Sequence, residues 1–113
     1  MDPLESAQEL ELVTRGRVTG KAHSVRVWFA HESGNLWLRT DSEAPDWLRN
    51  LKVQPRCEIR IGDVVRTAAY EPTPDRAAAL KHIVALWRAK YVPDWVQDWY
   101  FERGREPVRL RLL

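Results

Sequence analysis

The sequence has few of the features that build disulfides or membrane spans. Its 113 residues include one cysteine, Cys57, so no disulfide can form within the chain. No run approaches the roughly 18 apolar residues that a membrane helix needs. The first ten residues, MDPLESAQEL, lack the basic start and apolar middle of a signal peptide. These absences predict a cytoplasmic protein that does not associate with a membrane.

A strong charge of either sign is also missing. The 18 lysines and arginines face 16 aspartates and glutamates, which leaves a formal net charge of +2. Proteins that bind nucleic acid over a broad surface are usually more basic, so a nucleic-acid partner is not expected. A hydrophobic fraction of 44% and six tryptophans indicate a folded chain. No repeat or linker-like segment divides it, and we expect one domain over residues 1–113.

Alternation of apolar and polar residues predicts several strands. In residues 23–32, two valines and Phe29 take one face, and Ser24, Arg26 and Trp28 take the other. Short turns rich in glycine separate most of the runs, which favours antiparallel pairing of neighbours. The six expected strands cover residues 10–15, 23–32, 36–40, 56–61, 64–71 and 108–112.

Helical spacing replaces alternation elsewhere. Short helices are expected over residues 3–9 and 44–53, and another through residues 95–100. A longer helix is expected from Thr73 to Tyr91, because Thr-Pro-Asp supplies an N-cap, a first-turn proline and an acid at the positive end of the dipole. Six antiparallel strands in this order can close into a small barrel with helices packed outside, which is an α+β fold.

The sequence patterns of common cofactor and metal sites fail. Gly16, Gly20 and Lys21 approach a nucleotide-binding P-loop, but the spacing is one residue short and Ala22 replaces the hydroxyl that binds magnesium. The three histidines and the cysteine are spread along the chain, with no two at ligand spacing. Cys57 shares a strand face with two isoleucines and is expected in the core. No metal site and no catalytic side chain are therefore expected.

Residues 14–23, TRGRVTGKAH, gather cations and glycines in one turn. The glycines let the backbone bend closely. Arg15, Arg17 and Lys21 offer charge and their neighbours offer backbone N–H groups, a combination that suits a phosphate or a carboxylate. A solvated turn without a ligand is the open alternative.

The tryptophans have two possible roles. Trp28 and Trp37 stand opposite the main aliphatic rows, where they either line a pocket for a flat ligand or lie under the helices. Trp87 continues an apolar helical stripe and is expected in the core. Trp95 and Trp99 crowd a short segment with more aromatic surface than one small helix can bury. Packing against a second subunit would cover it, so we expect a homodimer.

Four stretches together resemble the deazaflavin-dependent nitroreductase family. They are GRVTGKAHSVRVWF, DWLRNLKVQP, CEIRIGDVVRTAAYEP and the helix ending WRAKY, and the resemblance covers residues 11–113. These relatives are split β-barrel proteins related to the FMN-binding pyridoxamine-phosphate oxidases. The resemblance therefore implies an α+β fold, a six-stranded antiparallel split β-barrel with helices packed outside.

The resemblance also implies a cofactor, deazaflavin (coenzyme F-420) or FMN. In the family, the turn between the first two strands holds the phosphate-bearing tail, and the ring lies near the tryptophan helix. Val18 stands where a second basic residue is common, His23 stands where arginine is frequent, and residues 41–45 form a short acidic loop. Deazaflavin, FMN, another flat ligand and no cofactor at all therefore stay open. The expected cofactor-binding residues are Arg15, Arg17, Thr19, Gly20, Lys21, His23, Trp28, Trp37 and Trp47.

Such cofactors transfer hydride themselves, so the protein needs only to bind the cofactor and admit a substrate. The expected function is that of an oxidoreductase that reduces a small organic acceptor. A non-catalytic protein that binds a small ligand or a cofactor on the same barrel is the alternative. Nucleic-acid binding through the basic turn and the strand residues Arg26, Arg39 and Arg60 is a third, less favoured hypothesis.

Overall fold

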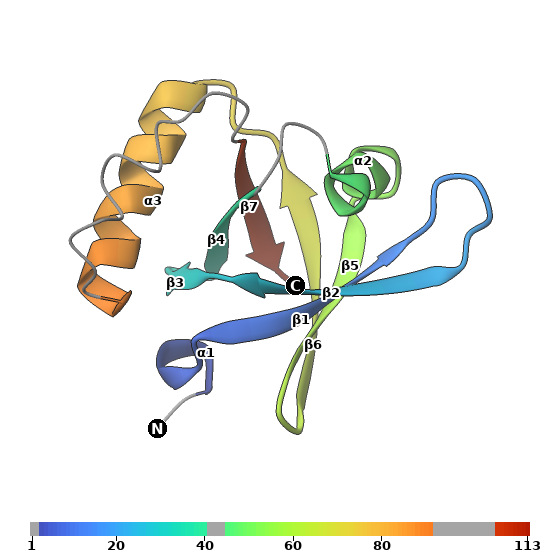
Figure 1. The fold of residues 1–113 in the computed structure, drawn as a ribbon, viewed down its shortest axis with the longest axis horizontal. Helices are drawn as coiled ribbons and strands as arrows, with labels where there is room; N and C mark the ends of the chain where they lie inside the picture. The colour runs from blue at the N-terminus through green and yellow to red at the C-terminus, as the bar shows by residue number, and fades with distance from the viewer. Residues whose placement is uncertain (1–2, 41–44, 92–105) are drawn as a thin grey trace.

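The fold is one curled sheet with three helices, and a computed structural model describes residues 3–40, 45–91 and 106–113 (Figure 1). The seven described strands are β1 (Glu9–Arg15), β2 (Ala22–Trp28), β3 (Ala30–Glu32), β4 (Asn35–Arg39), β5 (Arg56–Ile61), β6 (Val64–Glu71) and β7 (Pro107–Leu112). The helices are α1 (Pro3–Ser6), α2 (Asp46–Val53) and α3 (Arg76–Tyr91). Within these ranges, no helix has the length and apolar content to cross a membrane.

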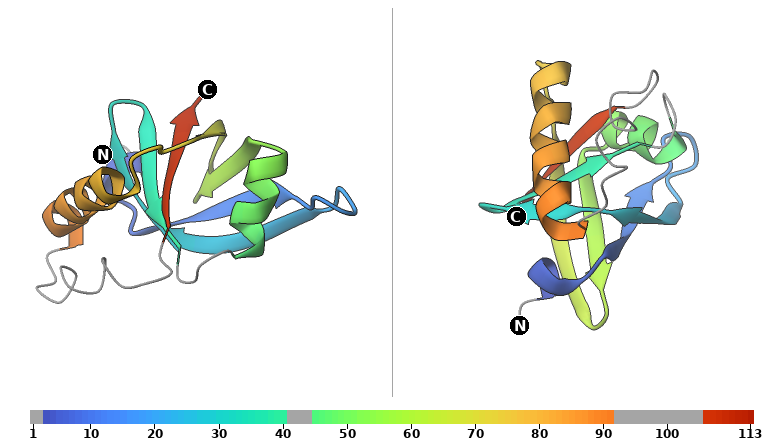
Figure 2. Two further views of the ribbon diagram at one scale, coloured as in Figure 1. Left: turned by 90° about the horizontal axis from the view of Figure 1, so that it is seen from above. Right: turned by 60° about the vertical axis from the view of Figure 1, so that its left-hand side comes forward.

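All pairings between strands are antiparallel, in the order β2-β1-β5-β6-β7-β4-β3. Strands β2 and β3 are neighbours in the chain but form opposite edges of the sheet. The sheet must therefore curl until its two edges meet, which produces the split barrel seen in Figures 1 and 2. The expected α+β split-barrel class is confirmed.

The strand count differs from the expected six because one expected strand is two. Residues 23–32 were expected to run without a break, but the chain leaves the strand at Phe29. Trp28 still pairs with β1, whereas Ala30 pairs with Trp37 on β4. Phe29 is fully buried at this crossing point. The alternation was read correctly, but a change of pairing partner leaves no trace in a period-2 pattern.

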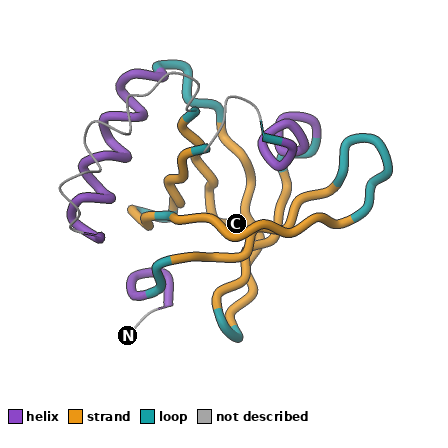
Figure 3. The backbone as a smooth tube through the Cα atoms, viewed as in Figure 1, coloured by secondary structure: helices purple, strands orange, loops and turns teal. Residues whose placement is uncertain are grey.

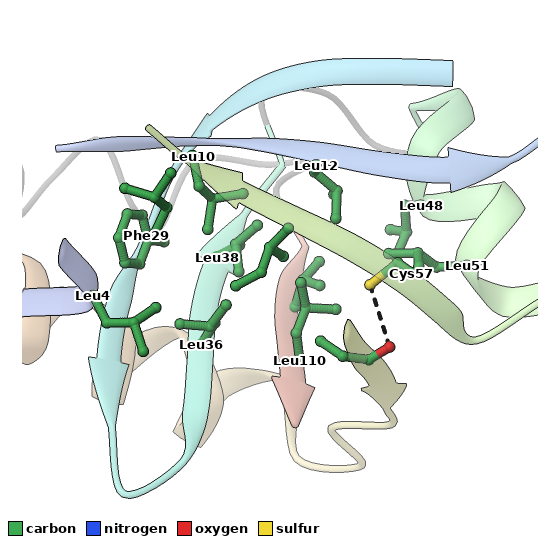
Figure 4. Close-up of a cluster of buried hydrophobic side chains, with 14 residues drawn as sticks. Leu4, Leu10, Leu12, Phe29, Leu36, Leu38, Leu48, Leu51, Cys57 and Leu110 are labelled. Carbon is green, nitrogen blue, oxygen red and sulfur yellow. Dashed lines mark hydrogen bonds between the residues drawn. The ribbon is translucent and has the colours of Figure 1, made fainter. Parts of the chain in front are cut away.

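The main core lies inside the curl of the sheet. Leu10 and Leu12 of β1 point toward Leu36 and Leu38 of β4, and all four are almost fully buried (Figure 4). Cys57 lies at the edge of this cluster, with its Sγ 3.6 Å from the carbonyl oxygen of Ala68 on β6. Burial raises the pKa of the Cys57 thiol to about 12. The expectation that Cys57 is a core residue is confirmed.

Helix α3 lies beside β3 and β4 (Figure 2). It covers a second, smaller hydrophobic cluster there. Trp87 is buried there, as expected, and its ring centroid lies 5.7 Å from that of Trp28. Trp37 packs under the same helix, because the Trp87 Nε1 donates to the Trp37 carbonyl oxygen at 3.3 Å and the Trp37 ring contacts His82. The expected short helix over residues 95–100 lies outside the described residues.

Local chemistry explains the turns and the start of α3. Ser33 and Gly34 both have positive φ in the β3–β4 hairpin, and Gly62 has φ +57° in the β5–β6 hairpin. The expectation that Thr73 caps α3 is wrong, because the N-cap residue is Asp75. Its Oδ1 accepts the backbone N–H of Ala78 at 3.0 Å, and the helix begins at Arg76.

Candidate functional site

The turn between β1 and β2 projects from the barrel and is closed by its own backbone (Figure 3). The Gly16 N–H donates to the Lys21 carbonyl oxygen at 2.8 Å, and the Gly20 N–H donates to the Gly16 carbonyl oxygen at 2.9 Å. A Cβ at Gly16 would lie 3.0 Å from His23 Nε2 and 3.3 Å from Thr19 Oγ1. The absence of a side chain at Gly16 therefore lets His23 and Thr19 approach the same point.

A buried asparagine ties this turn to α2. Asn50 is 4% exposed, and its Oδ1 accepts hydrogen bonds from the Arg17 backbone N at 3.2 Å and from Arg17 Nη1 at 2.8 Å. Its Nδ2 donates to Thr14 Oγ1 at 3.3 Å. Arg17 also lies 3.4 Å from Asp46, whose side chain is largely exposed. Because a buried amide needs partners for both ends, these bonds fix the direction of the Arg17 side chain.

A first cavity of about 380 Å³ lies between this turn and α2. Its walls are residues 16–19 of the turn, residues 23–25 of β2, and Asp46, Trp47 and Asn50 of α2. The guanidinium of Arg17 is the permanent positive charge of the lining, which also contains His23. The first cavity thus combines a fixed cation, a hydroxyl and a flat aromatic wall.

A second cavity of about 300 Å³ continues along β2. It shares Val25 and Trp47 with the first cavity, so the two cavities are neighbours, and together they are called the groove. Its other walls are residues 26–28 of β2 together with Glu9, Arg39 and Trp87. The second cavity lies at the seam of the barrel, because β2 and β4 approach each other there without pairing.

The backbone of β2 adds hydrogen-bonding groups to this groove. The hydrogen bond between Gly16 and Lys21 shows that these two residues form a hydrogen-bonded pair. Along an antiparallel ladder, hydrogen-bonded pairs alternate with pairs whose N–H and C=O groups point away from the partner strand. The N–H and C=O groups of Ser24 and Arg26 therefore turn away from β1, toward the open edge. No strand in the described parts of the chain pairs with that edge.

The structure brings together some of the expected site residues and separates others. Arg17, Thr19, His23 and Trp47 line the first cavity, and Trp28 lines the second. The expected residues that line neither cavity are Arg15, Gly20, Lys21 and Trp37. Arg15 and Lys21 are exposed, while Trp37 lies under α3.

Sequence reasoning missed the two buried polar residues of the groove, Asn50 and Arg39. Asn50 follows Trp47 by three positions on a helix, so both side chains face the same side, and this spacing could have linked Asn50 to the site. Arg39 ends a strand whose apolar face is Leu36 and Leu38, and only the curl of the sheet brings it to β2.

Within the described ranges, no three histidine, cysteine or acidic side chains gather to hold a metal ion. Cys57 is buried and its raised pKa keeps it a neutral thiol, so it is not a nucleophile. The groove can instead bind an anion beside the turn and a flat ring beside the tryptophans.

Comparison with known proteins agrees with this chemistry. A family model described as F420H(2)-dependent quinone reductase matches residues 2–98. No curated protein matches the sequence. A solved reductase dependent on reduced coenzyme F-420 is 22% identical and covers 93% of this chain and 94% of its own, with a TM-score of 0.64.

Two further solved structures share the fold. HutZ, the haem storage protein of Vibrio cholerae, is 14% identical and has a TM-score of 0.75, with 98% of this chain and 85% of that chain covered. An FAD-binding protein from Mesorhizobium loti is 18% identical and has a TM-score of 0.69, with 96% and 82% covered. At these identities the likeness concerns the split-barrel fold.

Proposed function

The chain belongs to the family of quinone reductases that depend on reduced coenzyme F-420, and from that premise we propose that it is an oxidoreductase that reduces a small organic acceptor with this deazaflavin. The two neighbouring cavities of the groove support the proposal. They offer a fixed cation and a hydroxyl at one end and tryptophan walls at the other. A phosphate-bearing tail and a flat ring require these two environments in that order.

The cofactor tail fits the first cavity. Arg17 would bind the phosphate, because its guanidinium is held at the cavity wall by Asn50. Thr19 Oγ1 and the His23 ring lie over Gly16, where a Cβ would press tightly against both. The other expected residues of the turn act less directly in this proposal. They shape the closed turn or add positive charge to it, and they are Arg15, Gly20 and Lys21.

The deazaflavin ring fits where the two cavities meet. Trp47 and Val25 border both cavities and would cover the ring, and the N–H and C=O groups of Ser24 at the strand edge would pair with its polar rim. Trp28 and Trp87 close the far end against water. The bound deazaflavin supplies the hydride, so the side chains of the groove only bind and orient.

FMN is the second candidate cofactor, because the first cavity contains one arginine and the side chain of Val18 is 89% exposed beside it. FMN carries a single phosphate, which one arginine can satisfy, whereas the longer deazaflavin tail carries further acidic groups. A protein that binds either cofactor without turnover is the non-catalytic form of the same proposal.

We also propose a homodimer. The groove lies along the open edge of β2, and Ser24 and Arg26 are exposed on that strand. A second copy over this edge would shield the bound ring from water. Light scattering across a concentration series tests this, and a monomer at high concentration contradicts it.

The experiment that tests the function is an anaerobic assay with reduced coenzyme F-420 and 1,4-naphthoquinone. We expect reappearance of the oxidised deazaflavin absorbance in proportion to added protein. A parallel assay with reduced FMN separates the two cofactors. If neither cofactor binds at tens of micromolar and neither is oxidised, the redox proposal is wrong.

A further inference from the structure

The second cavity is unusual for a site that accepts a neutral quinone, because two arginines are in its lining. Arg39 comes from the end of β4 and Arg26 from the open edge of β2. Arg39 is 4% exposed although it borders a cavity. Charged side chains are rarely this buried, so the position of Arg39 calls for a chemical reason.

The burial of Arg39 determines how strongly its guanidinium would bind an anion. Its Nη1 donates to the Thr40 carbonyl oxygen at 2.9 Å, which fixes the plane of the guanidinium. A carboxylate that meets a buried, oriented guanidinium forms a bond stronger than one in water, because the surrounding dielectric is low. Arg39 can therefore discriminate between an acid and its neutral analogue.

The charged residues that line the second cavity are two arginines and one glutamate. Among the described residues, no acidic side chain forms an ion pair with Arg26, and Glu11, which is opposite it on β1, pairs with Arg60 at 3.3 Å. Glu9 is the acidic residue of the lining, but it is exposed. Water screens an exposed carboxylate much more than it screens the buried Arg39.

The other walls of the second cavity are flat and aromatic. Trp28 and Trp87 lie 5.7 Å apart between ring centroids with their planes tilted by 49°, and Trp47 stands where the second cavity joins the first. Aromatic walls select a flat conjugated body, and a volume of about 300 Å³ sets its size at a few fused rings.

We propose that the second cavity binds an aromatic or conjugated carboxylic acid, with its carboxylate on Arg39 and Arg26 and its ring against the tryptophan walls. The inference deepens the proposed function, on which it rests, by giving the acceptor an acidic group. In turnover, a quinone acid would gain one hydride and one proton and become the hydroquinone acid. Both would leave the reduced cofactor, so the exchange balances without another reactant.

Calorimetric titration with naphthalene-2-carboxylate and naphthalene-2-carboxamide tests the proposal on the full chain without cofactor. The two probes share a ring system and differ by one charge. We expect the carboxylate to bind at least about tenfold more tightly than the amide, as a charge-assisted hydrogen bond in a buried site predicts. Equal affinities would overturn the proposal.

Substitutions of single arginines test which residue causes the preference for the carboxylate over the amide. Arg39→Met should reduce the preference for the carboxylate to less than about threefold, and circular dichroism will show whether the variant is folded. If it does not fold, the exposed Arg26→Gln decides, with an expected two- to fivefold loss of carboxylate affinity. Arg66→Gln, an exposed arginine on β6 that borders neither cavity, is the matched control and should change nothing.

The two proposals fail separately. A preference for the carboxylate that persists in folded Arg39→Met, or that is lost equally in Arg66→Gln, would place the acid elsewhere and overturn this inference. Binding of coenzyme F-420 to the wild-type chain, measured in parallel by fluorescence, would then still support the proposed function. Loss of cofactor binding with an intact carboxylate preference would overturn the proposed function instead.

Discussion

The side-chain oxygen of Asn50 accepts two hydrogen bonds from Arg17, one from the backbone N at 3.2 Å and one from Nη1 at 2.8 Å. The donor and the acceptor are 33 positions apart in the chain. One side chain on α2 therefore sets both the path of the β1–β2 turn and the direction of its arginine. The first cavity depends on this relationship, because Arg17 and Asn50 are both in its wall.

Replacement of Asn50 by alanine should destabilise the protein and loosen the turn. Two bonds from Arg17 and one to Thr14 would be lost at a buried position, which costs about 2–3 kcal/mol of unfolding free energy. Urea unfolding measures the loss. Arg49→Ala, on the exposed side of the same helix, is the control and should change stability by less than about 0.5 kcal/mol. Equal effects of the two substitutions would contradict the role given to Asn50.

Alanine substitutions at the two glycines of the turn should have different effects, one on cofactor binding and the other on stability. In Gly16→Ala the new methyl group displaces the His23 ring, so we expect about three- to tenfold weaker cofactor binding with little loss of stability. In Gly20→Ala nothing lies within 4 Å of the new Cβ, but φ of +74° strains the backbone by about 1–2 kcal/mol. Unfolding curves and fluorescence titrations of both variants separate the effects. Wild-type cofactor affinity in the Gly16→Ala protein would contradict a role for His23 in cofactor binding.

A cation at position 18 should strengthen the binding of an anionic tail. Val18 is 89% exposed and borders the first cavity, so Val18→Lys adds charge without a packing cost. We expect about two- to fivefold tighter binding of coenzyme F-420 at low salt and a smaller gain at high salt. Val65→Lys places the same charge at another exposed valine on β6, outside the groove, and should have no effect. A gain in both variants would point to long-range attraction alone.

Cys57 should be unreactive in the native state. Its pKa of about 12, against an ordinary 9.0, lowers the thiolate fraction at pH 8 by about 1000-fold. Because the folded-state pKa is raised, the stability that it contributes is complete below pH 9 and is lost as the pH rises toward 12. Labelling with a thiol reagent should proceed only after unfolding. Rapid labelling of the folded chain would contradict the buried position.

Much of the fold was predictable because its signals are local. Gly62 between two alternating runs fixed the β5–β6 hairpin to the residue, since a glycine with positive φ and the period of two agree there. The break at Phe29 was not predictable, because it depends on which strand each half finds as a partner. Sequence periodicity shows which residues share a face of a strand, but it does not show which strand pairs with it.

The candidate site divides in the same way. The cationic turn was visible as a local cluster, and Arg17, Thr19 and His23 do share a cavity. Arg15 and Lys21 are exposed and line neither cavity. The spacing from Trp47 could have linked Asn50 to the site, whereas Arg39 reaches the groove only through the curl of the sheet, which no pattern near it in the sequence indicates.

The account depends most on Arg17 as the anchor of the cofactor tail. Fluorescence titration of coenzyme F-420 against the wild-type chain, Arg17→Ala and the exposed control Arg66→Ala tests this directly. We predict that Arg17→Ala weakens binding by about 10- to 100-fold, the value of a charge-assisted hydrogen bond to phosphate, and that Arg66→Ala stays within about twofold of wild type. Equal affinities of the wild-type chain and folded Arg17→Ala would contradict the central claim.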